Sequence, residues 1–299
     1  MKIAIIGAGF SGCNIYHHLN KHKNIKLTLF EKSRGVGGRI STKYIDGKLI
    51  DHGTYKFKTK NIKFKNFLKE YIEKKILKKR KNYYIPTNGM NKLCSHIINE
   101  KDLITNSKIE SIKMKNNKWY IKDSNNRLYE KFDKVIITIP SPQILELNIK
   151  LDKKIENLLS KVVYKSIYSI IHYSNNIKEN IIKNKNVDIN NSKIIKKRVN
   201  NSLKYNYNDF ISYIYHIKSK YSNHRQDIDK IINKIKYNNN QNIIKHFWKY
   251  AITKKNINKE FIYKNNNIGF CGDYFKNKNL EGSFNSSYKL YKTIVKSIY

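Results

Sequence analysis

The chain has 299 residues and a formal net charge of +39, with 61 lysines and arginines against 22 acidic residues. Its hydrophobic residues (39%) and aromatic residues (12%) can fill a substantial core, which excludes wholesale disorder. No apolar run reaches the roughly 18 residues of a membrane span. The apolar N-terminus is short and interrupted by glycines, unlike a signal peptide, so we expect a cytoplasmic protein.

The positive charge has two interpretations: a surface for nucleic acid or anionic membrane, or a compositional bias toward Lys, Asn and Ile. The lysines are spread over almost the whole chain. Nucleic-acid readers usually rely on arginine for bidentate contacts, whereas this chain has six, at Arg34, Arg39, Arg80, Arg127, Arg198 and Arg225. Bias is therefore favoured, and a nucleic-acid partner is not expected.

The cysteines predict neither a metal site nor a disulfide framework. Cys13, Cys94 and Cys271 are odd in number, far apart and outside any CxxC pair. We expect three buried structural thiols and no metal.

The chain opens with one βαβ unit. Lys2–Ile6 is an apolar β-branched run typical of a buried parallel strand, Ser11–Asn20 is predicted to be a helix, and Lys26–Phe30 a second strand ending at Glu31. The turn between the first strand and the helix reads GAGFSG, from Gly7 to Gly12.

This GxGxxG turn predicts a dinucleotide site. Gly7 permits the tight turn, Gly9 lets the backbone approach a pyrophosphate, and Gly12 allows the helix to pack closely on the strand. The helix N-terminus offers N–H groups to phosphates, and Glu31 stands about 20 residues on, where a carboxylate accepts from ribose hydroxyls. The alternative is a glycine-rich turn without a ligand.

A second glycine-rich loop follows at once, KSRGVGGRIST from Lys32 to Thr42. A simple NAD unit does not need it, and it carries Arg34 and Arg39. We expect it to wrap the far side of the pyrophosphate and approach a flavin ring, rather than to be a flexible basic loop.

The remaining elements complete an α/β fold. Residues 102–133 alternate like an antiparallel meander, Lys134–Ile139 is a strand stopped by Pro140, and Asn267–Cys271 is a last strand before a helix over Gly282–Ile298. The fold class predicted is α/β: a Rossmann-type FAD-binding domain with an inserted α+β substrate domain containing a mixed or antiparallel sheet.

The insertion is predicted in a stretch without Gly or Pro, residues 143–266. Strand-like Tyr164–His172 and Phe210–Ile217 alternate there with helix-like Asp227–Ile235, and Asn190-Asn191 and Asn238–Asn242 are predicted loops. The expected FAD-binding domain comprises 1–58, 86–142 and 262–299. The expected substrate-binding domain comprises 59–85 and 143–261.

Several further segments resemble the glutathione-reductase-type flavoproteins of the amine-oxidase superfamily, and within it the renalase-like branch. They are FEKSRGVGGRIST (30–42), DHGTYKF (51–57), PTNGM (86–90), FDKVIITIPSP (132–142), HFWKYA (246–251), GFCGD (269–273) and LEGS (280–283). They occur in the family's order.

The resemblance implies an FAD cofactor. Its phosphates would lie at the first glycine turn, its ribose at Glu31 and Lys32, its adenine near Ile109, and its isoalloxazine at residues 281–284. The cofactor-binding residues implied are Gly7, Gly9, Ser11, Gly12, Glu31, Lys32, Gly38, Arg39, His52, Gly53, Ile109, Gly272, Asp273, Glu281, Gly282, Ser283 and Phe284.

No catalytic residue is assigned; His52 and Trp248 are the candidates near the flavin. A turn-stabilising role for His52 and an ordinary core role for Trp248 are the alternatives. The chain departs from the family where Tyr55 and Lys56 replace its glutamine, and where the stretch between Phe57 and Pro86 is short.

The activity implied is hydride transfer from a reduced small molecule to flavin and then to O2, giving hydrogen peroxide. In the renalase-like branch that molecule is a dihydronicotinamide dinucleotide (NAD(P)H) isomer. The alternatives are a flavin amine oxidase acting on a small amine, and a non-catalytic flavin-retaining basic protein that binds nucleic acid or anionic lipid.

Overall fold

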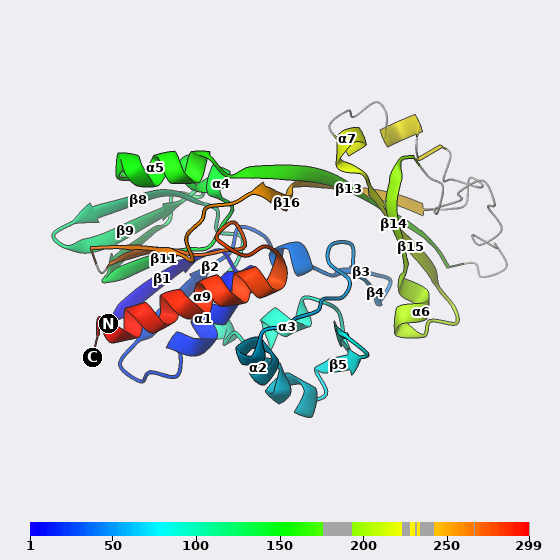
Figure 1. Ribbon diagram of the computed structural model, residues 1–299, viewed down its shortest axis with the longest axis horizontal. Helices are drawn as coiled ribbons and strands as arrows, with labels where there is room; N and C mark the ends of the chain where they lie inside the picture. Colours follow the sequence, from blue (N-terminus) through cyan, green and yellow to red (C-terminus); the bar gives the residue numbers. More distant parts are fainter. Residues whose placement is uncertain (176–192, 223–227, 231, 234–241, 266, 299) are drawn as a thin grey trace.

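The computed structural model describes residues 1–175, 193–222, 228–230, 232–233, 242–265 and 267–298 (Figure 1). Three sheets of four or more strands dominate it, two of them packed face to face. The third reaches away from them on the long strands β13 and β16.

The central sheet has the strand order β17-β18-β11-β1-β2-β7, parallel except for β17. Its strands are β1 (Lys2–Ile6), β2 (Lys26–Phe30), β7 (Leu103–Ile104), β11 (Lys134–Ile137), β17 (Ile262–Lys264) and β18 (Ile268–Phe270). In this order β1, which precedes the first glycine turn, lies between β2 and β11, and β18 lies beyond β11. The predicted α/β fold with a Rossmann-type unit is confirmed.

Alternation along β1 divides the core into two layers. Ile3 and Ile5 face the helices α1 (Phe10–Leu19) and α9 (Asn279–Lys296), which lie side by side on one face of the sheet (Figure 1). Ala4 and Ile6 face the other way, toward a second sheet. Both faces of the strand are therefore buried, as its continuous apolar sequence predicts.

That second sheet has the order β10-β9-β8-β12 and contains the predicted meander. Its strands are β8 (Ile109–Lys115), β9 (Lys118–Asp123), β10 (Leu128–Phe132) and β12 (Asn148–Ile149). The expectation that Leu103-Ile104 belongs to this meander is wrong. These residues form β7, which pairs with Leu29 and Phe30 at the edge of the parallel sheet.

The third sheet has the order β14-β15-β13-β16. Its strands are β13 (Val163–Ser174), β14 (Ile195–Asn200), β15 (Ile211–Ile217) and β16 (Asn242–Lys255). Two of them contain the predicted strands Tyr164–His172 and Phe210–Ile217, except that Phe210 precedes β15. Asn242, predicted to be a loop residue, begins β16. Asn190-Asn191, residues 238–241 and part of Asp227–Ile235 lie outside the described residues, and the domain limits stay a prediction.

Shorter elements connect the sheets. They are β3 (Lys43–Ile45), β4 (Lys48–Ile50), α2 (Ile62–Glu73), β5 (Leu77–Arg80), β6 (Tyr83–Pro86), α3 (Lys92–Ser95), α4 (Ser141–Leu145), α5 (Lys153–Ser160), α6 (Asn201–Tyr205), α7 (Ser219–Ser222) and two 3-10 turns (Gly38–Ile40, Glu100–Asp102). The three cysteines are buried free thiols, as expected. No helix in the described part of the chain is long and apolar enough to cross a membrane.

One fully buried carboxylate, Asp51, joins the segments that flank the glycine loops to the third sheet. It accepts hydrogen bonds from the Thr42 hydroxyl (2.6 Å) and from the Met90 backbone N–H (2.9 Å). On its other side it accepts from the Tyr205 hydroxyl (2.5 Å) and from the ammonium group of Lys204, both at the C-terminal end of α6. Residues more than 150 positions apart therefore meet on one carboxyl group.

The Asp51–Lys204 ion pair is shielded from solvent, because 8% of the lysine side chain and none of the aspartate side chain is exposed. Burial lowers the pKa of Lys204, and this effect exceeds the increase that the adjacent Asp51 carboxylate causes. The ammonium also donates to the Tyr55 carbonyl at 2.8 Å, so two of its three N–H donors are used within the protein.

Replacing Lys204 by methionine should therefore destabilise the fold by about 3–5 kcal/mol, because it leaves a buried carboxylate without its cation. Urea-induced unfolding measures the change. Lys74→Met is the control, since Lys74 pairs with Glu70 on the surface and such pairs contribute less than about 1 kcal/mol. Equal losses in the two variants would contradict the role given to the buried pair.

Candidate active site

The first glycine turn leaves room at the N-terminus of α1. Gly7 has φ +102°, and a Cβ on Gly12 would lie 1.9 Å from the Gly7 carbonyl oxygen, so both positions need glycine for the fold itself. Gly9, in contrast, has an ordinary extended backbone, and a Cβ there would meet nothing within 4 Å. No side chain caps the helix, and Ser11 is buried in its first turn. The turn thus presents an open face at a helix N-terminus.

Glu31 fixes the shape of this turn from the end of β2. One carboxylate oxygen accepts from the Ala8 N–H and the other from the Ser33 N–H, both at 2.9 Å. The side chain is buried, while the neighbouring Lys32 is exposed. The carboxylate therefore ties the first glycine turn to the start of the second glycine loop.

The second glycine loop lies directly against the first. The Gly37 N–H donates to the Ala8 carbonyl at 2.8 Å, and Gly9 and Gly37 form an isolated parallel bridge. A Cβ on Gly38 would lie 3.4 Å from the Gly9 Cα. The two loops therefore form one continuous backbone wall beside the open face of Gly9.

Arg39 extends this wall to the C-terminal segment. Its guanidinium donates to both carboxylate oxygens of Asp273, at 2.8 and 2.5 Å, and Asp273 itself is 6% exposed. The preceding residue, Gly272, donates its N–H to the Ser286 hydroxyl of α9 at 3.1 Å. The predicted N-terminal and C-terminal cofactor segments are thus in direct contact.

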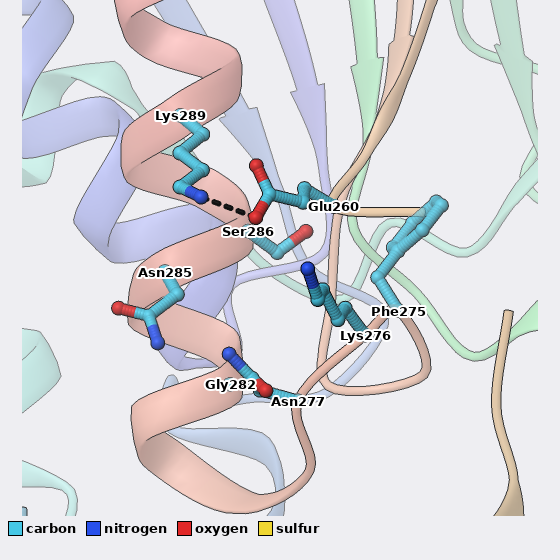
Figure 2. A pocket seen from close by; sticks show the side chains of 8 residues that line it. All are labelled: Glu260, Phe275, Lys276, Asn277, Gly282, Asn285, Ser286 and Lys289. Carbon is cyan, nitrogen blue, oxygen red and sulfur yellow. Dashed lines mark hydrogen bonds and ion pairs between the residues drawn. The ribbon is translucent and has the colours of Figure 1, made fainter. Parts of the chain in front are cut away.

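The start of α9 is packed tightly against neighbouring backbone. A Cβ on Gly282 would lie 1.8 Å from the Asn277 carbonyl oxygen, and the two residues are adjacent in Figure 2. The Glu281 carboxylate accepts from the Lys60 and Asn61 N–H groups at 2.8 and 3.2 Å, at the beginning of α2.

The next two residues of α9 are buried. Ser283 is 6% exposed, and the Phe284 ring stacks on that of Phe64 at 4.5 Å. The contacts of Glu281, Gly282, Ser283 and Phe284 with an isoalloxazine ring stay predictions.

His52, His246 and Trp248 form an aromatic cluster where the segment after β4 meets β16. The His52 ring stacks on Trp248 (centroids 5.3 Å apart) and meets His246 edge-on at 4.7 Å. His246 and Trp248 lie on the same side of β16, because side chains alternate along a strand. Both are half-buried, while Phe247 between them is exposed.

The backbone of residues 52 and 53 is held as closely as the rings. The His52 carbonyl accepts from the Ser169 hydroxyl at 2.6 Å and from the Trp248 indole N–H at 3.4 Å. A Cβ on Gly53 would lie 2.3 Å from the Arg39 carbonyl oxygen and 3.2 Å from the Trp248 ring. The cluster is therefore joined to the same Arg39 that reaches Asp273.

The histidines of the cluster are neutral near neutral pH. Burial, followed by the nearby His246, lowers the pKa of His52 to about 4. Burial likewise lowers the pKa of His246 and of His216, whose ring lies 3.3 Å from the His52 carbonyl. They can exchange hydrogen bonds with a substrate but add no positive charge.

Ile109 lies in the core between the parallel sheet and the meander, 6% exposed and in the same cluster as Phe30. Its predicted contact with adenine stays a prediction. The sequence did not assign Asp51, Ser169, Lys204, Tyr205, His216 or His246 to the site. Only Asp51 and His246 stood inside a family-like motif. Lys204 lies in the Asn- and Tyr-rich stretch NNSLKYNYN (200–208), which contains no recognisable motif.

These features fit an FAD molecule. The unfilled face of Gly9 suits a diphosphate, the uncapped N-terminus of α1 supplies N–H groups to it, and the second glycine loop closes its far side. Among the described residues, no group of three or more His, Cys, Asp or Glu side chains could hold a metal ion.

Family comparisons agree with this geometry. Residues 5–71 match the NAD(P)-binding Rossmann-like domain, and residues 56–180 match the flavin-containing amine oxidoreductase family. Residues of both glycine loops fall within the first match, and the meander falls within the second.

Two curated relatives match over short segments. The chain is 37% identical over 71 residues to prenylcysteine oxidase 1 of Pongo abelii, covering 23% of this chain and 14% of that protein. It is 41% identical over 59 residues to protoporphyrinogen oxidase of Dictyostelium discoideum, covering 17% of this chain and 11% of that protein. The matches therefore span only a small part of the relatives.

Solved structures resemble the whole chain in fold. A CLA-producing fatty acid isomerase from P. acnes has a TM-score of 0.69 at 10% identity, covering 97% of this chain and 98% of its own. An oxidoreductase from Methanosarcina mazei has a TM-score of 0.66 at 11% identity, covering 98% and 100%.

Together the two family matches support an FAD-binding Rossmann domain of the flavin amine oxidase superfamily. The expected FAD cofactor is confirmed by the family matches. The renalase-like branch stays a prediction.

Gly9→Val should remove FAD binding while leaving the apoprotein folded, because the new side chain fills space that only a ligand would occupy. We expect FAD affinity to fall at least about 100-fold, or roughly 3 kcal/mol. Absorbance of the purified protein and FAD titration measure it.

Gly12→Ala is the matched control, since its Cβ would collide with the Gly7 carbonyl and should lower the stability of the protein itself. A Gly9→Val protein that purifies with full flavin would refute the assignment of the first glycine turn, Gly7 to Gly12, as the site of the FAD phosphates.

Stability should fall as the pH drops from about 6.5 toward 4. The folded-state pKa of His52, about 4, lies below the ordinary value of 6.5, so between these values the unfolded chain binds the proton more readily. The contribution is fully present above pH 6.5 and amounts to about 3 kcal/mol. Urea unfolding at several pH values should show a shallower decline for His52→Asn, and identical pH profiles would rule the effect out.

Proposed function

We propose that this protein is an FAD-dependent oxidase that takes a hydride from a reduced, anionic small molecule, with a dihydronicotinamide dinucleotide isomer as the preferred candidate. The observation that carries the proposal is the junction of Arg39 with Asp273, Gly53 and the His52–Trp248 cluster. It adjoins the two glycine loops expected to hold the cofactor.

FAD bound there would accept the hydride and pass the electrons to O2, giving hydrogen peroxide. The protein's own part is to position the substrate. Trp248, which is half-buried, offers a flat aromatic surface for a nicotinamide ring, and the neutral, half-buried His246 imidazole offers hydrogen bonds without charge. A cytoplasmic location remains part of the proposal.

The electrostatic surroundings favour an anionic substrate over a cationic one. Lys43 lies close enough to depress the pKa of both His52 and His246, and the chain carries a net charge of +39. The second candidate, oxidation of a small amine, is favoured by the description of the matching family. A protonated amine would meet repulsion at this site.

Anaerobic mixing of the FAD-loaded protein with candidate substrates separates these functions. We expect the visible flavin absorbance to bleach with NADH isomers whose hydride lies at an unproductive ring carbon, and to persist with ordinary NADH and with putrescine. Admission of O2 should then restore the absorbance and yield peroxide. Bleaching by putrescine instead would assign the amine oxidase function, and no bleaching by any candidate would favour a non-catalytic binding protein.

A further inference from the structure

A groove lies between the start of α2 and the exposed side of α9. Its volume is about 490 Å³, within the range of small-molecule sites, roughly 300–1,000 Å³. The lining comes from residues 60–63 and, at helical spacing, from residues 284, 285, 288, 289 and 292 of α9. None of these belongs to the two glycine loops, and only Phe284 is also among the predicted cofactor-binding residues.

The floor of the groove is the end of a stack of aromatic rings. Phe57 stacks on Phe64 at 5.9 Å, Phe64 on Phe284 at 4.5 Å, and Phe284 on Tyr288 at 5.6 Å with an interplanar angle of 8°. Tyr288 is half-buried and lines the groove. The stack therefore holds the Tyr288 ring in a fixed orientation, as a surface on which a planar ligand can stack.

Lysine ammonium groups surround this aromatic floor. Lys60, Lys63 and Lys292 are exposed, and the Lys63 nitrogen lies 5.6 Å from the Tyr288 ring centroid. Within the described ranges, none of the three forms an ion pair with a carboxylate.

The acidic groups nearest the groove are already engaged. The Glu281 carboxylate is bound by the start of α2, and Glu260 pairs with Lys289, as Figure 2 shows. Glu281 keeps its negative charge, but the three lysines outnumber it, so the groove retains a net positive charge for a ligand.

Asn285 adds a polar group to the groove. Its side-chain oxygen accepts from the Asn61 amide at 2.9 Å, and the Asn61 oxygen in turn accepts from the Phe64 N–H at 3.0 Å. This arrangement orients the Asn285 NH2 as a donor that can meet the edge of a base.

We propose that this groove is a second nucleotide site, which binds a free nucleoside polyphosphate. The base stacks on Tyr288 and the phosphates bind Lys60, Lys63 and Lys292. The volume suits one nucleotide, and all three lysines line this one groove, so a free nucleotide is favoured over a nucleic-acid strand.

Calorimetric titration of the FAD-loaded protein tests the site, with ADP as the probe and the flavin absorbance recorded to show that FAD stays bound. ADP should bind at least about tenfold more tightly than adenosine and than inorganic pyrophosphate. Adenosine lacks the phosphates that bind the lysines, and pyrophosphate lacks the base that stacks on Tyr288. Pyrophosphate binding as tight as that of ADP, or tighter binding of oligothymidylate per site, would overturn the proposal.

Charge reversal distinguishes ADP binding in the groove from non-specific attraction of ADP to the positive charge of the whole chain. The double variant Lys63→Glu/Lys292→Glu should weaken ADP binding at least about tenfold. The matched control, Lys113→Glu/Lys115→Glu on exposed positions of β8, should leave it unchanged. Equal effects of the two double variants would overturn the site.

Removal of the ring gives an independent measurement. Tyr288→Ala should weaken ADP binding about tenfold or more, whereas Tyr288→Phe, which keeps the stacking surface, should bind ADP as the wild type does. If the alanine variant does not fold, the phenylalanine variant and the lysine pair still decide. Loss of binding in Tyr288→Phe would contradict stacking as the basis of recognition.

Discussion

The bidentate pair between Arg39 and Asp273 joins two segments that are 234 residues apart in sequence. The pairing is set up by the sheet, in which β2, which precedes Arg39, and β18, which precedes Asp273, are separated by β1 and β11, and all four strands run parallel. The loops that leave their carboxyl ends must therefore meet at the same edge. The two glycine loops, the aromatic cluster and, through the Gly272–Ser286 hydrogen bond, helix α9 all adjoin this junction.

Asp51 supplies a second constraint, which acts between the glycine loops and the third sheet. It precedes His52 directly, so its buried contacts with Lys204 and Tyr205 also fix where the aromatic cluster begins. A buried ion pair contributes little net stability against a hydrophobic replacement, but breaking it is costly. We infer that its value here is geometric: it holds the third sheet and the glycine loops in one arrangement.

The sequence predicts what depends on local pattern. β1 and β2 match their predicted bounds, and the closing helix begins only three residues earlier than expected, because apolar runs and glycine turns mark them. Leu103-Ile104 was misplaced since a two-residue apolar pair is compatible with either sheet, and its true partners, Leu29 and Phe30, are distant in sequence. Lys204 could not be singled out, because nothing in its local sequence distinguishes this buried lysine from the many exposed lysines of the chain.

Most of the tightly placed glycines are required by protein packing, whereas the glycine at position 9 is not. Gly12, Gly53 and Gly282 stand where a Cβ would lie within 2.5 Å of backbone, so packing alone explains them. Gly9 does not fit that explanation: it is half-buried, its backbone is ordinary, and a side chain would meet no protein atom within 4 Å. Since the protein does not use that space, and the open face lies at an uncapped helix N-terminus, the proposed phosphate site gives a physical reason for a glycine there.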